Sequence, residues 1–155
     1  MERGYQKDFS SRGTAMFNVE ERERKAKTMI AVLQQHFGQD LGEMSVLNVG
    51  GSAGIIDNYL SQHFGSVIGI DIDEKAIVYA QNNYQRDNLT FEVGDAMHLR
   101  FADNSFDVVV CSQVYEHVPD SGMMMKQIYR VLKAGGVCYF AAGNRLMWNE
   151  PHYNL

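Results

Sequence analysis

The sequence has little that would suit a secreted protein or a membrane protein. It contains only two cysteines, Cys111 and Cys138, and both lie inside apolar runs, so we interpret them as small buried residues in a reducing compartment. No apolar run approaches the ~20 residues that a membrane-spanning helix requires, and the first residues lack the apolar core of a signal peptide. These absences predict a cytoplasmic protein without a membrane span.

Metal-ligand spacing and excess positive charge are also missing. The five histidines are not spaced as ligands with one another or with the cysteines, so we expect no metal site. The formal net charge of -5 argues against nucleic acid as the main partner. At 155 residues, 45% of them hydrophobic and 21% charged, the chain has the length and composition of one globular domain. Its oligomeric state is not indicated.

The most informative stretch spans residues 46–60, where an apolar run breaks into Gly-Gly-Ser-Ala-Gly and then resumes. This break predicts a buried strand that ends in a tight turn and opens a helix. Because glycine has no side chain, Gly50, Gly51 and Gly54 would let a ligand lie against the backbone at the carboxyl edge of a sheet. The alternative is a turn that only packs the helix on the strand.

Hydrophobic periodicity predicts strands and helices in alternation along the chain. An N-terminal arm (1–17) precedes a cap helix (18–38). The capping pair Asn18 and Glu21 predicts the start of this helix. The mixed charges at 20–25 predict a solvated face rather than a binding patch. The core (45–142) follows. Its strands are expected at 46–49, 67–71, 89–93, 106–112 and 137–142, and its helices at 54–65, 73–84 and 124–132. This order predicts an α/β fold: a doubly wound, mostly parallel Rossmann-like sheet with helices on both faces.

Carboxylates follow two of the predicted strands. Asp71 closes the second strand 21 residues after Gly50, close to the ~20-residue interval at which nucleotide-binding βαβ units place an acid for ribose hydroxyls. Asp73 is interpreted as the N-cap of the next helix. Asp95 follows Gly94 at the end of the third strand. Because the carboxyl ends of parallel strands meet at one edge, we expect these groups to share a crevice.

With these residues, the sequence resembles the class I S-adenosylmethionine-dependent methyltransferases, especially the type 11-like group that acts on small molecules. The likeness covers most of residues 44–142. It is carried by the glycine-rich motif at 49–54, the ribose-binding acid Asp71, the adenine-binding segment 94–96, the fourth-strand motif 106–109 and the Leu-Lys-Ala-Gly-Gly element at 132–136. Two positions depart: Asn48 stands where the family has an acid, and Ser52 where it has a glycine.

The resemblance implies an enzyme of the EC 2.1.1 class that moves the sulfonium methyl group of S-adenosylmethionine to an O, N or C nucleophile and leaves S-adenosylhomocysteine. The acceptor would be a small molecule, a lipid or a glycan precursor. His117, next to Glu116, is the candidate acid or base, and the alternative is that this pair only holds its loop together. His152 and Tyr153 are further candidates for the acceptor pocket. The residues implied to bind the cofactor are Asn48, Gly50, Gly51, Ser52, Gly54, Asp71, Ile72, Asp95, Ala96, Ser112 and Gln113.

The family's sheet has seven strands, whereas this chain has room for five, so we expect a C-terminally truncated fragment of a longer protein that lacks the last two. Two other functions remain open. One is a non-catalytic domain that binds S-adenosylmethionine or serves as a scaffold. The other is a nicotinamide dehydrogenase, although its Gly-x-Gly-x-x-Gly spacing fails because positions 50, 52 and 55 read Gly, Ser and Ile.

Overall fold

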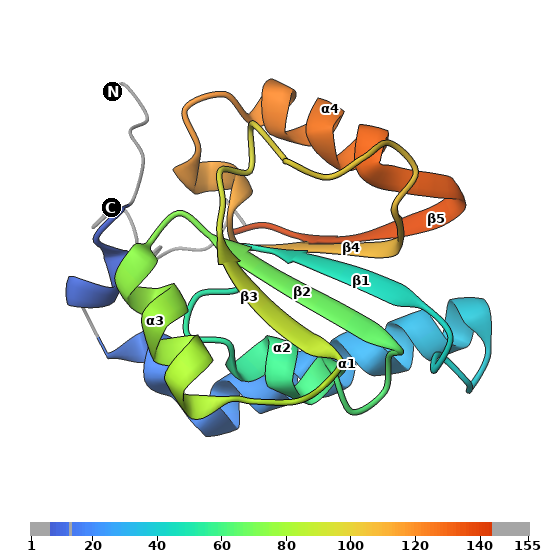
Figure 1. The fold of residues 1–155 in the computed structure, drawn as a ribbon, viewed down its shortest axis with the longest axis horizontal. Coiled ribbons are helices and arrows are strands. Elements are labelled where there is room, and N and C mark those ends of the chain that lie inside the picture. Colours follow the sequence, from blue (N-terminus) through green and yellow to red (C-terminus); the bar gives the residue numbers. More distant parts are fainter. Residues whose placement is uncertain (1–6, 13, 144–155) are drawn as a thin grey trace.

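A computed structural model of the chain describes residues 7–12 and 14–143, which form one parallel sheet covered by helices (Figure 1). The five strands of this sheet lie in the order β3-β2-β1-β4-β5. All neighbouring strands are parallel, as the alternation of strands and helices predicts. The strands are β1 (Ser45–Val49), β2 (Ser66–Asp71), β3 (Leu89–Val93), β4 (Phe106–Ser112) and β5 (Leu132–Ala141).

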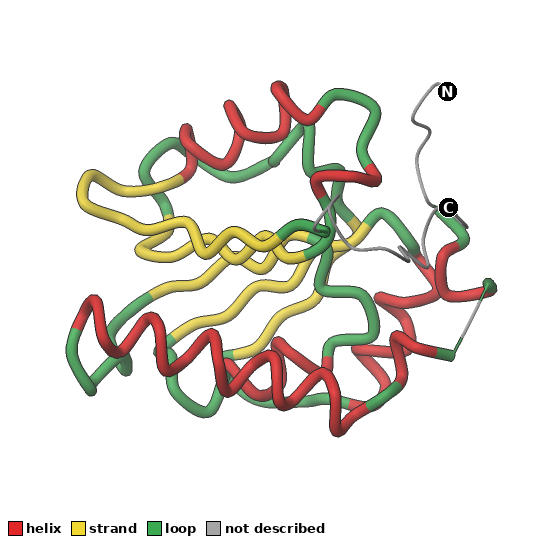
Figure 2. Tube along the Cα trace, turned by 180° about the vertical axis from the view of Figure 1, so that it is seen from behind, coloured by secondary structure: helices red, strands yellow, loops and turns green. Residues whose placement is uncertain are grey.

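Helices cover both faces of the sheet, as the views from the front and from behind show (Figures 1 and 2). On one face lie α1 (Val19–Phe37), α2 (Ile55–Leu60) and α3 (Glu74–Asn83), and on the other lies α4 (Ser121–Val131). Short 3₁₀ helices occur at Phe9–Ser11 (η1), Ala15–Phe17 (η2) and Tyr115–His117 (η3). Each face has its own apolar core, and the central strands β1 and β4 contribute to both. This two-sided burial explains why both strands are apolar almost throughout.

The helix ends follow their predicted capping residues. The Asn18 side chain accepts a hydrogen bond from the Glu21 amide at 3.1 Å, and α1 ends at Gly38, which has a φ of +100°. The Asp73 carboxylate accepts from the amides of Lys75 and Ala76, which confirms Asp73 as the N-cap of α3. Both caps satisfy amides that the first helical turn leaves without a partner.

Helix α4 begins three residues earlier than predicted, at Ser121, and two other boundaries differ more. Helix α2 ends at Leu60 rather than at Gly65, because the chain turns there to run beside the loop before β1. The Gly65 amide donates to the Met44 carbonyl, and a Cβ at Gly65 would collide with the Gly42 carbonyl. Gly65 therefore permits a close approach of two loops and does not end the helix.

Strand β5 starts at Leu132, directly after α4, and not at residue 137. Leu132 pairs with Phe106, Lys133 Nζ lies 2.8 Å from the Asp107 carboxylate, and the register shifts before Val137 pairs with Val108. The glycine-rich element thus forms an irregular start of the strand. Because β5 lies at the edge of the sheet, Cys138 is only half-buried, whereas Cys111 in β4 is fully buried as expected.

Within residues 7–12 and 14–143, no helix combines the length and the apolar character that crossing a bilayer would require.

Candidate functional site

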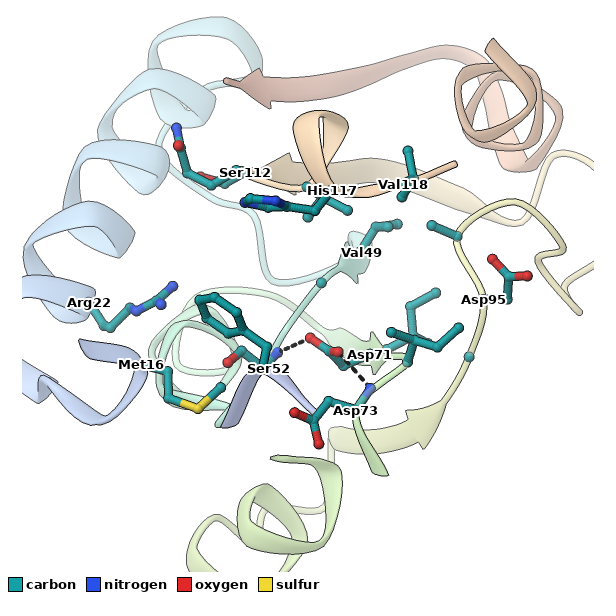
Figure 3. A pocket seen from close by; sticks show the side chains of 18 of the residues that line it. Met16, Arg22, Val49, Ser52, Asp71, Asp73, Asp95, Ser112, His117 and Val118 are labelled. Carbon is teal, nitrogen blue, oxygen red and sulfur yellow. Dashed lines mark hydrogen bonds between the residues drawn. The ribbon is translucent and has the colours of Figure 1, made fainter. Parts of the chain in front are cut away.

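A pocket of about 500 Å³ lies at the carboxyl edge of the sheet and is called the edge pocket below (Figure 3). Its walls come from the segments that follow β1, β2, β3 and β4, which is where open α/β sheets bind their ligands. Residues of η1 and η2 and the first turns of α1 close its remaining side. Eight of the eleven residues implied to bind the cofactor line this pocket: Gly50, Ser52, Asp71, Ile72, Asp95, Ala96, Ser112 and Gln113.

The glycine turn after β1 uses its own amides to hold its shape. The amides of Gly50 and Gly51 both donate to the Ile70 carbonyl, at 2.8 and 2.9 Å. The Ser52 amide donates to the Asp71 carboxylate at 2.9 Å, and the Gly54 amide donates to the Gly51 carbonyl at 3.1 Å. These four donors are therefore already engaged inside the protein.

Ser52 adopts a left-handed backbone with a φ of +53°, between Gly50 at +79° and Gly54 at +78°. Serine pays for this conformation in steric strain that glycine avoids. Position 52 thus has a left-handed backbone although it is not glycine. Its Oγ atom is buried without a hydrogen-bond partner among the described residues.

Asp71 lies at the centre of the edge pocket with both carboxylate oxygens oriented by the backbone (Figure 3). One oxygen accepts from Ser52 N and the other from Asp73 N, each at 2.9 Å. Burial raises the pKa of Asp71, and the hydrogen bonds from Asp73 and Ser52 oppose the shift. Because a carboxylate offers about four acceptor positions, this one can still accept hydrogen bonds from a ligand's hydroxyl groups.

Asp95 and Ala96 form the wall of the pocket that follows β3. The Asp95 carboxylate accepts from the Met97 amide at 2.8 Å and lies 2.9 Å from His98 Nδ1. After β4, Gln113 takes a φ of +60°, and its amide donates to the Ala141 carbonyl at 2.7 Å. This bond ties the pocket wall after β4 to the end of β5.

Three of the implied residues do not line the pocket: Asn48, Gly51 and Gly54. The Asn48 amide group donates to the Asp57 carboxylate at 3.0 Å. A Cβ at Gly51 would lie 2.9 Å from that same carboxylate, and one at Gly54 would lie 2.7 Å from the Ala80 methyl group. In the described structure these positions support the turn by close packing rather than by facing the pocket.

The adjacent residues Glu116 and His117 point to different surroundings. His117 lines the edge pocket, where its ring lies 6.3 Å from that of Phe9 (Figure 3). Glu116 does not line it, and both of its carboxylate oxygens are buried without a hydrogen-bond partner among the described residues. Of this pair, only His117 lines the pocket. The candidates His152 and Tyr153 lie outside the described residues.

The sequence reasoning missed the contribution of α1. Glu21, Arg22 and Lys25 line the edge pocket, so the predicted purely solvated face is wrong at these positions. Burial lowers the pKa of the Arg22 guanidinium, and Glu21 and Asp71 oppose this shift. A signal was present: Arg22 precedes Ala26 by four residues and Met29 by seven, so it lies on the buried stripe of the helix.

The charges in the pocket are arranged in two groups. Asp71, Asp73 and Asp95 follow the strand ends, while Arg22 and Lys25 come from α1 together with Glu21, whose carboxylate lies 2.8 Å from Lys25 Nζ. In Figure 3, Arg22 and Asp95 lie at opposite ends of the view, with Asp71 between them. Among the described residues, no group of three or more His, Cys, Asp or Glu side chains is arranged to hold a metal ion.

The glycine turn, the acid after β2 and the pocket at the strand ends define a Rossmann-like domain of the class I methyltransferase type. A family model described as a methyltransferase domain matches residues 47–140, and the chain belongs to this family. That membership decides against a nicotinamide dehydrogenase.

Two curated relatives and two solved structures illustrate the family. A ubiquinone biosynthesis O-methyltransferase of Coxiella burnetii is 32% identical over 102 residues, covering 64% of this chain and 44% of the relative. A demethylmenaquinone methyltransferase of Lactobacillus johnsonii is 42% identical over 76 residues, or 46% of this chain and 31% of the relative. The chain thus spans less than half the length of these relatives.

Among solved structures, the YcgJ protein of Bacillus subtilis superposes with a TM-score of 0.64 at 26% identity, covering 74% of this chain and 48% of that one. An S-adenosylmethionine-dependent methyltransferase of Mesorhizobium loti has the same fold, with a TM-score of 0.59 at 23% identity over 63% of this chain and 45% of that chain.

Proposed function

We propose that this chain binds S-adenosylmethionine in the edge pocket and forms part of a methyltransferase acting on a small-molecule acceptor. The observation that carries the proposal is the match between the pocket's polar groups and a cationic ligand. The amides of Gly50, Gly51, Ser52 and Gly54 are engaged internally, so they do not offer the donors that a dinucleotide's pyrophosphate would require. The carboxylates at the strand ends suit a ligand with sulfonium and ammonium charges.

The parts of the cofactor are assigned from the pocket's chemistry. Asp71 would accept hydrogen bonds from the ribose hydroxyls, and Asp95 with Ala96 would hold the adenine ring. The methionine portion would lie along the glycine turn beside Ser112 and Gln113. Arg22, a cation on the α1 side of the pocket, is suited to the methionine carboxylate.

When bound, the cofactor supplies the activated methyl group. The protein's contribution is to hold the acceptor atom in line with that group and to exclude water, and well-oriented reactants can reach effective molarities of about 10⁵ M or more. We assign His117 the role of taking the acceptor's proton, because it is the imidazole that lines the pocket within the described residues.

For the acceptor, the names of the relatives point to O-methylation in ubiquinone biosynthesis and to demethylmenaquinone. We therefore place a small acceptor with a phenolic or quinone ring first among the candidates, ahead of glycan precursors. A lipid-tailed form of such a ring belongs to the same class. The cytoplasmic location indicated by the sequence stays a prediction.

Calorimetric titration with S-adenosylmethionine, S-adenosylhomocysteine and NAD tests the proposal. Binding of both sulfur compounds without NAD supports it. Binding of none of the three favours a scaffold. Transfer of a labelled methyl group to a panel of phenols and quinones then separates an enzyme from a domain that only binds the cofactor, because the latter shows affinity without product.

A further inference from the structure

A carboxylate is enclosed directly beneath the glycine turn. Asp57, on α2, is 0% exposed, and one of its oxygens accepts a hydrogen bond from Asn48 Nδ2 at 3.0 Å. Its other oxygen has no hydrogen-bond partner among the described residues. Burying a carboxyl group with one unpaired oxygen lowers the stability of the folded protein, so packing alone does not explain an acid at this position.

The surrounding glycines create the space that this carboxylate occupies. A Cβ at Gly51, in the turn, would lie 2.9 Å from Asp57 Oδ2, and a Cβ at Gly69, in β2, would lie 2.6 Å from Oδ1. The carboxylate thus lies behind the same backbone segment whose Gly50 and Ser52 face the edge pocket. Gly51 packs against the carboxylate, while its chain neighbours Gly50 and Ser52 line the pocket.

We propose that Asp57, held by Asn48, is a positioning residue whose negative charge acts through the glycine turn as the countercharge for the cationic methionine end of S-adenosylmethionine. This inference rests on the proposed function. The family has an acid on β1 at the position of Asn48. In this chain the negative charge near the turn would come from Asp57 on α2 instead. Because an uncharged asparagine pairs with the acid, the two side chains together hold one ionisable group.

The charge on Asp57 should respond to the ligand. Burial raises the pKa of Asp57 to about 7, the Asn48 hydrogen bond opposes this shift, and Asp71, the charged side chain across the turn, adds to it. A sulfonium or ammonium group above the turn would favour the ionised form. Binding of S-adenosylmethionine near neutral pH would therefore release a proton from Asp57 to the solvent.

S-adenosylhomocysteine separates this effect from the rest of the site, because it has the same adenosine and amino-acid groups but a neutral sulfur atom. The experiment measures the dissociation constants of both compounds at pH 5.5 and 7.5 for the intact chain. The preference for S-adenosylmethionine over S-adenosylhomocysteine is expected to be about sixfold greater at pH 7.5 than at pH 5.5 if Asp57 titrates near pH 7 with the neutral sulfur compound bound and about one pH unit lower with the sulfonium compound bound. In Asp57→Asn, which keeps the size of the side chain, this pH dependence should disappear.

Two further variants show whether charge or shape is responsible. The exchange Asn48→Asp/Asp57→Asn returns a single carboxylate to the same pair and should restore the preference at pH 7.5. Asp87→Asn, which removes an exposed charge, should behave as the wild type.

Unchanged preference and pH dependence in Asp57→Asn would overturn the inference, as would an exchange variant that stays at the level of Asp57→Asn. If the wild type binds neither compound, the proposed function falls and this inference falls with it; if it binds both regardless of Asp57, only the inference falls.

Discussion

The amide of Ser52 donates to the carboxylate of Asp71 over 2.9 Å, and this hydrogen bond joins the turn after β1 to the end of β2. The same carboxylate accepts from the Asp73 amide on its other oxygen. Asp71 is thus held in place from both sides before any ligand arrives. A ligand's hydroxyl groups meet a preorganised acceptor, which lowers the entropic cost of binding.

Replacing Asp71 by Asn should weaken S-adenosylmethionine binding about 10- to 100-fold, because hydrogen bonds to a charged acceptor contribute roughly 1.5–3 kcal/mol and an amide group would face two backbone donors. Calorimetry measures the loss. Asp73→Asn is the matched control, since asparagine caps a helix as well as aspartate does. Equal losses in the two variants would contradict the assignment of Asp71 to the ribose.

Ser52→Gly should stabilise the protein by about 0.5–1 kcal/mol. Glycine removes the strain of the left-handed backbone, and this favourable term is larger than the entropic cost of ordering a glycine, which is more flexible than serine in the unfolded chain. The free energy of unfolding in urea provides the measurement. Asn104→Gly, at a φ of +57° outside the edge pocket, is the comparison. A less stable Ser52→Gly protein would show that the buried hydroxyl group contributes more than the strain costs.

Gly54→Ala should destabilise the protein by more than about 2 kcal/mol, since strain and overpacking act together. A Cβ there would lie 2.7 Å from the Ala80 methyl group and 2.8 Å from the Phe91 ring. Gly135→Ala isolates the strain, because Gly135 has a φ of +80° and nothing within 4 Å of the added atom. Equal urea midpoints for the two variants would be inconsistent with the packing described behind the turn.

Asp57 should make the protein less stable as the pH rises. Its folded-state pKa of about 7 exceeds the ordinary value of 3.8, so its contribution is most favourable below pH 4 and is lost as the pH rises through 7. Relative to Asp57→Asn, the wild type should lose roughly 2–3 kcal/mol of unfolding free energy between pH 5 and pH 8. Urea titrations at several pH values measure this difference. A constant difference across the range would mean that Asp57 does not titrate there.

His117→Gln should leave the affinity for S-adenosylmethionine within about twofold of the wild type and lower the turnover by about 100-fold, because general-base catalysis contributes roughly 10²–10⁴-fold. Binding is measured without an acceptor and turnover with the acceptor found in the panel. Near-normal turnover would rule out an essential base at this position.

The sequence predicts which residues lie at the strand ends better than it predicts how the helices pack around them. The sequence alone predicts that Gly50, Asp71 and Asp95 lie close together, because parallel strands present their carboxyl ends at one edge of a sheet. The caps Asn18 and Asp73 follow from local hydrogen bonding and needed no knowledge of the tertiary structure. For these residues, local pattern and fold agree.

Other features depend on contacts between distant segments. The mixed-charge run at 20–25 does not reveal that Arg22 lines the edge pocket, because the position of Arg22 depends on how α1 packs on the sheet. Nor does the isolated Asp57 reveal its pairing with Asn48, which requires α2 to fold back on β1. The start of β5 at Leu132 likewise depends on its pairing with Phe106.

Backbone NMR during titration with S-adenosylmethionine tests the central claim most directly. The account predicts saturable shifts of the amide signals of residues 50–54, Asp71 and Asp95, with little change at the opposite edge of the sheet. In Asp71→Asn, half-saturation of these shifts should require about 10- to 100-fold more S-adenosylmethionine. Absence of shifts at millimolar S-adenosylmethionine, or shifts confined to residues outside the edge pocket, would contradict it.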